Sequence, residues 1–472
     1  MSGMMGPFFV TSALGLLEYM PVFDCEIDGV WVANCTKTQI CGDGHTAIVP
    51  YKIDYSEHTS FYNWVGPFNL VCAGPLHMGM IGSAILLGWA STVWFVPYLS
   101  TKYGRKGIFT ISCTIEVGTL AMLLYWCSSL LQAILLMLFL GMSTSGRLSV
   151  GFAYMSEFLT PDWRVYFSCA FYVLNGMAGL LSVLYFDYVD ASYKYITSAS
   201  LFFLGFSVVG MLTFVQESPL WQMKQIGKQD LAKTTLRKMV READHGMIDD
   251  IVDKSSSETY TGNENIKIVI PRTVQLKEDT KAYKIECTEE EENDMGWYLK
   301  QRDIVINLLV FGYVWSGTVF AFFNLNFHIK FLPGKVFGNY LCADISNIVS
   351  SCISVALIRR LGRRTTFTIN FIIALTGSIC IFTAQMPETR VNPHYWMPTF
   401  VLISKFGISG NFVNLYVSTV ACFPTQFMVV ALGICNFWSR LIPSLAPQVA
   451  ERPQPIPMVI EMSVLLSLII AV

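Results

Sequence analysis

Long apolar segments, repeated along nearly the whole chain, restrict this sequence to a membrane fold. A helix needs about 20 mostly apolar residues in a row to cross a bilayer. About twelve segments meet that description, and a polar stretch divides them into two sets. The first set lies near 4–23, 77–98, 107–127, 130–158, 165–189 and 195–215, and the second near 304–327, 336–357, 367–384, 398–420, 429–447 and 457–472. We therefore predict an all-α polytopic membrane protein built from two six-helix halves.

The composition excludes a soluble domain. Of the 472 residues, 53% are hydrophobic and 14% are charged, whereas roughly a quarter of the residues in a soluble protein are charged. A formal net charge of −2 provides no basic field for nucleic acid. No nucleophile–base pair, metal-ligand spacing or phosphate-binding loop stands out. We therefore expect neither an enzyme nor a bound cofactor or metal.

Two short basic turns define the predicted topology. Each turn joins two apolar segments and combines a glycine with several cations: Lys102, Gly104, Arg105 and Lys106 in the first, and Arg360, Gly362, Arg363 and Arg364 in the second. Such turns stay in the cytoplasm because Lys and Arg resist translocation, and glycine permits the tight turn. With both turns inside, both termini are cytoplasmic as well. The repetition about half a chain apart indicates two related halves, as in many secondary transporters.

The same topology divides the chain into regions. We expect an N-terminal six-helix half over 1–215, a cytoplasmic central loop over 216–302 and a C-terminal six-helix half over 303–472. In the central loop, 228–247 can form an amphipathic helix, and the composition after residue 253 is typical of a disordered segment. The last apolar segment is short and runs to residue 472 without a polar tail, as a truncated chain would.

A polar loop over 24–69 follows the first apolar segment, and the topology makes this loop extracellular. It contains the glycosylation sequon Asn34-Cys35-Thr36. Four cysteines lie in the loop or close to its end, and in an extracellular setting they are disulfide candidates whose pairing the sequence leaves open: Cys25, Cys35, Cys41 and Cys72.

Several short motifs occur in an order and spacing that match a known family. They are Phe68-Asn-Leu-Val-Cys72, the basic turn Leu99–Lys106, the group Tyr154, Glu157, Pro161 and Arg164, Glu217-Ser-Pro-Leu-Trp221, and Ser404–Phe412 with Tyr416 and Phe423-Pro-Thr425. Together they resemble the major facilitator superfamily and, within it, the organic cation, organic anion and carnitine transporter family. The resemblance covers most of the chain.

The resemblance implies a cytoplasmic gate made of charged side chains. Its members here are the two basic turns together with Glu157, Arg164 and Glu217. The sequence departs from the family pattern at four gate positions, which are Thr101, Arg359, Ala421 and Met428. An expected Glu and an expected Arg are lost together at the last two, which avoids leaving one charge unpaired in a desolvated site. We therefore expect a gate that closes unevenly, and the sequence leaves open whether this impairs transport.

Charged and aromatic residues within the apolar segments are candidates for a substrate site. Arg440 is the strongest, because the matching family position tends to be Arg in anion and carnitine carriers, and a guanidinium can hold a carboxylate through two hydrogen bonds. The alternatives are an Arg that snorkels to the interface or pairs within the protein. Lys405 matches a family lysine, or else pairs with Asp344. Five aromatic residues are candidates for the cavity wall: Tyr154, Tyr313, Trp315, Phe412 and Tyr416.

The sequence thus favours a plasma-membrane carrier of small organic ions, carboxylate-bearing or zwitterionic, that works by alternating access. Its partners would be the substrate, the lipid bilayer and either a coupling ion (a proton or sodium) or an exchanged counter-solute. Two alternatives remain, which are a sugar-type porter of the same superfamily and a receptor that does not transport. Substrate flux distinguishes a carrier from a receptor, and the charge of the ligand distinguishes an organic ion from a sugar.

Overall fold

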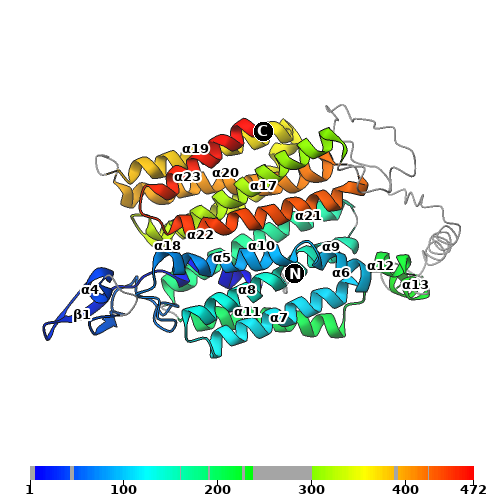
Figure 1. Cartoon of the computed structure of the whole chain (residues 1–472). Coiled ribbons are helices and arrows are strands. Elements are labelled where there is room, and N and C mark those ends of the chain that lie inside the picture. Colours follow the sequence, from blue (N-terminus) through cyan, green and yellow to red (C-terminus); the bar gives the residue numbers. More distant parts are fainter. Residues whose placement is uncertain are drawn as a thin grey trace.

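The computed structural model describes residues 6–42, 47–159, 161–189, 192–225, 229–237, 300–386, 392–423 and 425–472. Long helices pack lengthwise into two bundles that lie side by side (Figure 1). By length and composition, eight helices in these ranges can cross a membrane, or nine if one bent pair counts as a single span. The all-α polytopic fold predicted from the sequence is therefore correct.

The predicted first span is not one continuous helix. Residues 6–22 form two short helices, α2 (Phe8–Ser12) and α3 (Leu14–Leu17), and a strand begins at Phe23. Glu18 caps α3 at its C-terminus, and Pro21 follows, which lacks the N–H that a continuing helix would need. The expected helix over 4–23 was therefore wrong, and its first residues, up to residue 5, lie outside the described residues.

The first bundle contains the remaining helices up to residue 213. Helices α5 (Pro75–Thr92) and α6 (Val96–Tyr103) form the bent pair, at 44° to each other. Helix α7 (Arg105–Tyr125) begins directly after Gly104. The next span runs from Leu130 to Glu157 as α8 (Leu130–Thr144), a π-helical turn η1 (Ser145–Val150) and α9 (Gly151–Glu157). Helices α10 (Pro161–Tyr188) and α11 (Tyr193–Thr213) complete the bundle.

The second bundle begins with α17 (Arg302–His328), which continues as the 3₁₀ turn η3 (Ile329–Phe331). Helices α18 (Val336–Leu361), α19 (Arg363–Ala384) and α20 (Pro393–Cys422) follow. The predicted span over 429–447 is broken, because α21 (Thr425–Leu441) gives way to a 3₁₀ turn, η4 (Ile442–Leu445), that contains Pro443. Helix α22 (Ala446–Ala450) and the last helix, α23 (Ile456–Ala471), are short.

The two bundles meet along two main contacts. Helix α10 packs on α18, and α5 packs on α21 and α22. Small residues allow these close approaches. Gly176 and Gly179 of α10 lie against Ile348 and Asp344 of α18, where an added side chain would overlap its neighbours. This contact surface runs through the middle of the molecule (Figure 1).

The predicted polar loop over 24–69 contains regular structure that the sequence did not indicate. Strands β1 (Phe23–Ile27), β2 (Val30–Val32) and β3 (Tyr51–Ile53) form an antiparallel sheet in the order β2-β1-β3, and α4 (Lys37–Cys41) packs beside it. Disulfides join Cys25 to Cys35 and Cys41 to Cys72. This loop projects from one end of the bundles, which we call the Cys-loop end (Figure 1).

The basic turns lie at the opposite end, which we call the basic-turn end. Two short helices of the central region, α12 (Pro219–Lys224) and α13 (Gln229–Arg237), are also at that end (Figure 1). Helix α13 falls within the amphipathic helix expected over 228–247. The remainder of that helix and the segment predicted after residue 253 lie outside the described residues, which resume at residue 300.

Candidate functional site

The first basic turn is tied to two carboxylates of its own half. Arg105 forms an ion pair with Glu157, with 2.6 Å between its Nη2 and a carboxylate oxygen. Glu217 accepts hydrogen bonds from the backbone N–H groups of Arg105 and Lys106, both at 3.0 Å. These N–H groups form the N-terminus of α7, where the helix dipole favours a negative charge. The carbonyl of Thr101 accepts a hydrogen bond from the indole of Trp221 at 2.7 Å, so a neutral contact holds the position where the family has an acid.

Gly104 makes this arrangement possible. Its backbone angles are φ 106° and ψ 151°, a conformation essentially limited to glycine. A side chain here would overlap the Oε2 atom of Glu217. The turn therefore depends on glycine both for its backbone and for the space that Glu217 occupies.

The second basic turn has no comparable partners among the described residues. Gly362 has the same backbone type, φ 82° and ψ 166°. Arg359, Arg360 and Arg364 are exposed, and the carbonyl of Arg363 accepts a hydrogen bond from Asn414 at 2.9 Å. The side chains of Arg164, Ala421 and Met428, which the sequence assigned to the gate or to its departures, lie outside the described side chains.

The sequence suggested that Tyr154 lines a central cavity, but in the structure it lies at the basic-turn end. Its hydroxyl donates a hydrogen bond to the backbone carbonyl of Gln216, next to Glu217. Its ring packs edge-on against Phe158. Tyr154 therefore supports the segment that carries Glu217.

Arg440 lies at the contact between the two bundles and is 5% exposed. Its guanidinium carbon is 3.6 Å from the ring centroid of Trp89, which α5 contributes from the first bundle. Its Nε atom has no hydrogen-bond partner, and among the described residues its guanidinium forms no ion pair. The result is a buried cation that stacks on an indole and keeps unused donors.

Aromatic residues from both bundles surround this cation. The rings of Tyr172 (α10) and Tyr416 (α20) pack at a tilt, with centroids 6.4 Å apart, and both residues interact electrostatically with Arg440. The ring of Trp315 (α17) packs edge-on against Tyr416, with centroids 4.7 Å apart, and its indole N–H donates to Thr419 at 3.0 Å. We call Arg440, Trp89, Tyr172, Tyr416 and Trp315 the Arg440 cluster.

Lys405 lies further along α20 and is fully buried. Its ammonium group donates hydrogen bonds to the side chain of Asn326 at 2.5 Å and to the carbonyl of Phe322 at 3.2 Å. It also lies 3.3 Å from the centroid of the Phe322 ring. The direct ion pair with Asp344 that the sequence offered as an alternative is absent from the described contacts, although the two charges interact at longer range.

One face of α20 connects Lys405 to the Arg440 cluster. Lys405, Phe412 and Tyr416 are seven and four residues apart, which places their side chains on the same face of the helix. Phe412 packs edge-on against Phe322, with centroids 5.0 Å apart. At 1.5 Å per residue, Lys405 and Tyr416 are roughly 16 Å apart along the helix axis. Lys405 and Tyr416 therefore lie at different heights on this face of α20.

Tyr313 is separate from this group. It is 46% exposed on the outer side of α17, and its hydroxyl hydrogen-bonds to Ser467 of α23. We therefore exclude it from the site. Sequence reasoning missed Trp89 and Tyr172, although both are mid-span aromatic residues of the kind used to choose the other candidates. What the sequence could not show was that they face Arg440.

Two other buried carboxylates have partners within their own bundle. Glu116 and Arg147 form an ion pair with 2.7 Å between Oε2 and Nε. Glu461 accepts hydrogen bonds from Asn324 at 2.8 Å and Ser378 at 3.1 Å. These groups are already satisfied, in contrast to Arg440.

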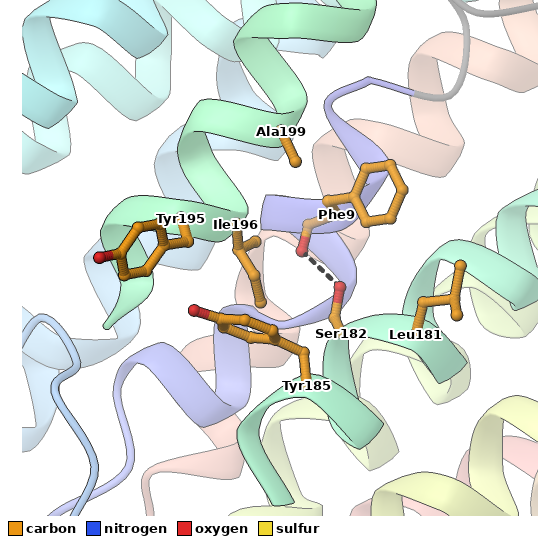
Figure 2. Close-up of a pocket in the computed structure, with 7 residues that line it drawn as sticks. All are labelled: Phe9, Leu181, Ser182, Tyr185, Tyr195, Ile196 and Ala199. Carbon is orange, nitrogen blue, oxygen red and sulfur yellow. Dashed lines mark hydrogen bonds between the residues drawn. The ribbon is translucent and has the colours of Figure 1, made fainter. Parts of the chain in front are cut away.

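A pocket of about 220 Å³ opens on the first bundle between α2, α10 and α11 (Figure 2). Leu181, Ile196 and Ala199 line it, and Ser182 on its wall donates a hydrogen bond to the carbonyl of Phe9 at 3.1 Å. Its lining contains no charged side chain. The Arg440 cluster, which holds a buried cation, is therefore a better candidate for an organic-ion site than this pocket.

Two helical bundles that meet around a buried cation define a polytopic membrane protein. The chain belongs to the Major Facilitator Superfamily, because the model of that family matches residues 47–447. It is 22% identical over 402 residues to human organic cation/carnitine transporter 2, covering 84% of this chain and 65% of that protein. It is 24% identical over 409 residues to a Drosophila melanogaster organic cation transporter-like protein, with 84% and 66% covered. The matched regions thus span about two thirds of these relatives.

Solved structures show the same fold. The inward-open xylose transporter XylE from E. coli aligns with a TM-score of 0.61 at 12% identity, over 99% of this chain and 93% of that chain. The human organic anion transporter MFSD10 (TETRAN) aligns with a TM-score of 0.54 at 13% identity, over 83% of each chain. At these identities the likeness establishes the fold alone.

Proposed function

We propose that this protein is a secondary active or facilitative transporter of small organic ions that carry a carboxylate, either anionic or zwitterionic. The single observation that carries the proposal is the guanidinium of Arg440, which is buried and has no ion-pair partner among the residues that the structure describes. A buried charge without a partner is costly. A substrate carboxylate would remove that cost, because the guanidinium can bind it through two parallel hydrogen bonds while stacking on Trp89.

The aromatic residues of the cluster suit the rest of such a substrate. Trp89, Tyr172 and Tyr416 offer ring surfaces beside the cation, and such surfaces bury the apolar part of an organic ion. Phe412 and Lys405 extend the same face of α20, with Lys405 as a second and more distant cationic position. A neutral sugar has no charge to offset Arg440, so we place the sugar-porter alternative behind an organic ion.

The site also suits alternating access. Trp89 and Tyr172 belong to the first bundle, whereas Arg440 and Tyr416 belong to the second. A substrate held among them contacts both bundles, so rocking of the bundles about it exposes the site to one side and then the other. The resemblance to transporters named for organic cations and carnitine supports the same substrate class.

The gate and the topology complete the proposal. The two basic turns, with Glu157, Arg164 and Glu217, form the cytoplasmic gate. Carboxylates anchor the first turn, whereas the second has none as a partner in the described part of the chain. The Cys-loop end is then extracellular, with Asn34 exposed for glycosylation, and both termini are cytoplasmic in the plasma membrane.

The test is substrate uptake by cells that express this protein and have no endogenous copy of it. The panel contains an organic anion, an organic cation, carnitine and a hexose, each measured with and without a proton gradient, in sodium and sodium-free medium. We expect uptake of the anion or of carnitine, and the gradients identify the coupling ion. Uptake of the hexose alone would overturn the proposal, and a surface-expressed chain that moves none of the four would favour the receptor alternative.

Variants of Arg440 locate the charge requirement. Arg440→Ala should abolish uptake of carboxylate substrates without loss of surface expression, and Arg440→Lys should weaken it because a lysine binds a carboxylate as a point charge. The matched control is Arg302→Ala, since Arg302 is exposed at the start of α17. Unchanged uptake in Arg440→Ala would remove Arg440 from the site.

A further inference from the structure

We propose that Glu18, Lys330 and Glu451 form an ionic latch that holds the Cys-loop end of the two bundles closed. The inference rests on the alternating-access cycle proposed above and adds the group that controls one of its two gates. The sequence motifs did not point to this latch, because the charged groups of the family resemblance belong to the gate at the basic-turn end.

The latch joins three segments that are distant in the sequence. The ammonium group of Lys330, in the turn η3, lies 3.0 Å from Glu18 and 2.5 Å from Glu451. Glu18 ends α3 in the N-terminal segment, and Glu451 caps α22 just before the last helix. The side chains of Lys330, Glu18 and Glu451 are 3%, 1% and 8% exposed. The three charges are therefore in direct contact and shielded from water.

The neighbouring chain fixes Glu18 on the side of the first bundle. The backbone N–H of Trp64 donates to the carbonyl of Leu17 at 3.0 Å, and the side-chain amide of Asn63 donates to the carbonyl of Tyr19 at 2.6 Å. Trp64 and Asn63 belong to the loop that the Cys41–Cys72 disulfide closes. The ion pair between Lys330 and Glu18 therefore connects the second bundle to the Cys loop.

The two bundles also touch at the latch through contacts that must separate if this end opens. The hydroxyl of Ser83 in α5 donates to the carbonyl of Ser444 in η4 at 2.6 Å. Gly15 of α3 lies against the hydroxyl of Tyr340 of α18. Phe61 of the Cys loop packs on Phe337 of α18, with centroids 5.7 Å apart. In this structure the Cys-loop end is closed.

The charge balance makes the latch reversible. Two carboxylates share one ammonium group, and the Oε1 atom of Glu18 has no hydrogen-bond partner. The attraction between the charges is largely offset by the cost of removing them from water. If the bundles separate, all three groups regain hydration. If Lys330 is removed, however, the closed state buries two carboxylates that have lost their contacting counter-charge, and among the described residues only the more distant Lys37 still acts on Glu451, so the open state gains.

The experiment measures opening directly. Ser83 is 6% exposed at the bundle contact, so a cysteine introduced there (Ser83→Cys) reacts with a membrane-impermeant maleimide when the Cys-loop end opens. Labelling is measured on intact cells without substrate, relative to the same chain without S83C. A wrong substrate class would therefore leave the result unaffected. In the S83C background, Lys330→Met should raise the labelling rate at least about tenfold, and Lys330→Arg should leave it within about twofold.

The matched control applies the same substitution to another ion pair at the same end. Lys52→Met removes the ion-pair partner of Asp24, which lies 3.6 Å from the Lys52 ammonium group. Because the Lys52 side chain is 59% exposed, this substitution should leave labelling unchanged. If Lys330→Met does not reach the surface, the neutral triple variant Glu18→Gln/Lys330→Met/Glu451→Gln replaces it, because this variant leaves no buried charge unpaired. Faster labelling in that variant supports the latch. Labelling as slow as in the parent, or an equal increase in Lys52→Met, overturns it.

Discussion

Alanine substitution at three glycines tests the account of the basic turns. Gly104 and Gly362 have the same glycine-specific backbone conformation, but a side chain at position 104 would overlap Glu217, whereas one at position 362 would meet no atom within 4 Å. Gly107, three residues after Gly104, lies in the regular helix α7, and an added side chain there also meets nothing within 4 Å. The three positions therefore separate backbone strain from the Glu217 contact.

The expected magnitudes follow from these differences. A non-glycine residue in this backbone region costs about 1–3 kcal/mol, which is the whole expected effect of Gly362→Ala. In Gly104→Ala the Glu217 carboxylate must also move, and losing a charge-assisted hydrogen bond to Arg105 or Lys106 adds about 1.5–3 kcal/mol. Gly107→Ala should stabilise α7 by up to about 1 kcal/mol, because alanine is the better helix former.

The assay is thermal unfolding of the purified protein in detergent at one fixed heating rate. For a unit of about 200 residues, each kcal/mol shifts Tm by roughly 2–4 °C. Gly104→Ala should therefore lower Tm by roughly 5–20 °C, Gly362→Ala by roughly 2–10 °C, and Gly107→Ala should leave it equal or higher. Equal losses for Gly104→Ala and Gly362→Ala would refute the role of Glu217, and a loss of the same size for Gly107→Ala would refute the argument from backbone conformation.

Two further predictions concern other parts of the structure. Trp89→Ala removes a cation–π contact worth about 2 kcal/mol in a desolvated site, so it should raise KM for a carboxylate substrate roughly tenfold to thirtyfold. The control is Trp94→Ala, which removes an indole that is 66% exposed. An equal change of KM in the control would contradict the prediction. The Cys41–Cys72 disulfide spans 31 residues and the Cys25–Cys35 disulfide spans 10. Replacing the first pair with serines should therefore lower the free energy of unfolding by about 3.7 kcal/mol, and replacing the second pair by about 2.7 kcal/mol. The reverse order of Tm losses in the two double variants would refute the loop-length argument.

The fold was largely predictable because membrane helices carry strong local signals. Uninterrupted apolar runs correctly located helices such as α7, α11 and α19, since a spanning helix satisfies all of its backbone groups within the segment. The same signal failed for the first segment, where hydrophobicity is high but the helix breaks before Pro21. It also failed at Pro443, which divides the segment after α21. Hydrophobicity reports whether a segment prefers lipid and does not report where its helix breaks.

The site was predictable only in part, for a related reason. Arg440 could be singled out because a charge within an apolar segment is expensive and therefore informative. Tyr154 and Tyr313 were placed beside it on the strength of mid-span position alone, and the structure places one at the basic-turn end and the other on the outer face. Trp89 and Tyr172 became evident only once the two bundles were packed together, since the direction in which a side chain points across a bundle contact is not a property of its local sequence.

The contact between Glu18 and Lys330 also has a consequence for biosynthesis. The two residues are 312 positions apart in the chain. At a synthesis rate of about 5–20 residues per second, the ribosome reaches Lys330 roughly 15–60 s after Glu18. Throughout that interval the first apolar segment carries a carboxylate that has no counter-charge. This segment can therefore reach its final position only after α17 has entered the membrane. Folding of the N-terminal segment thus depends on the second bundle.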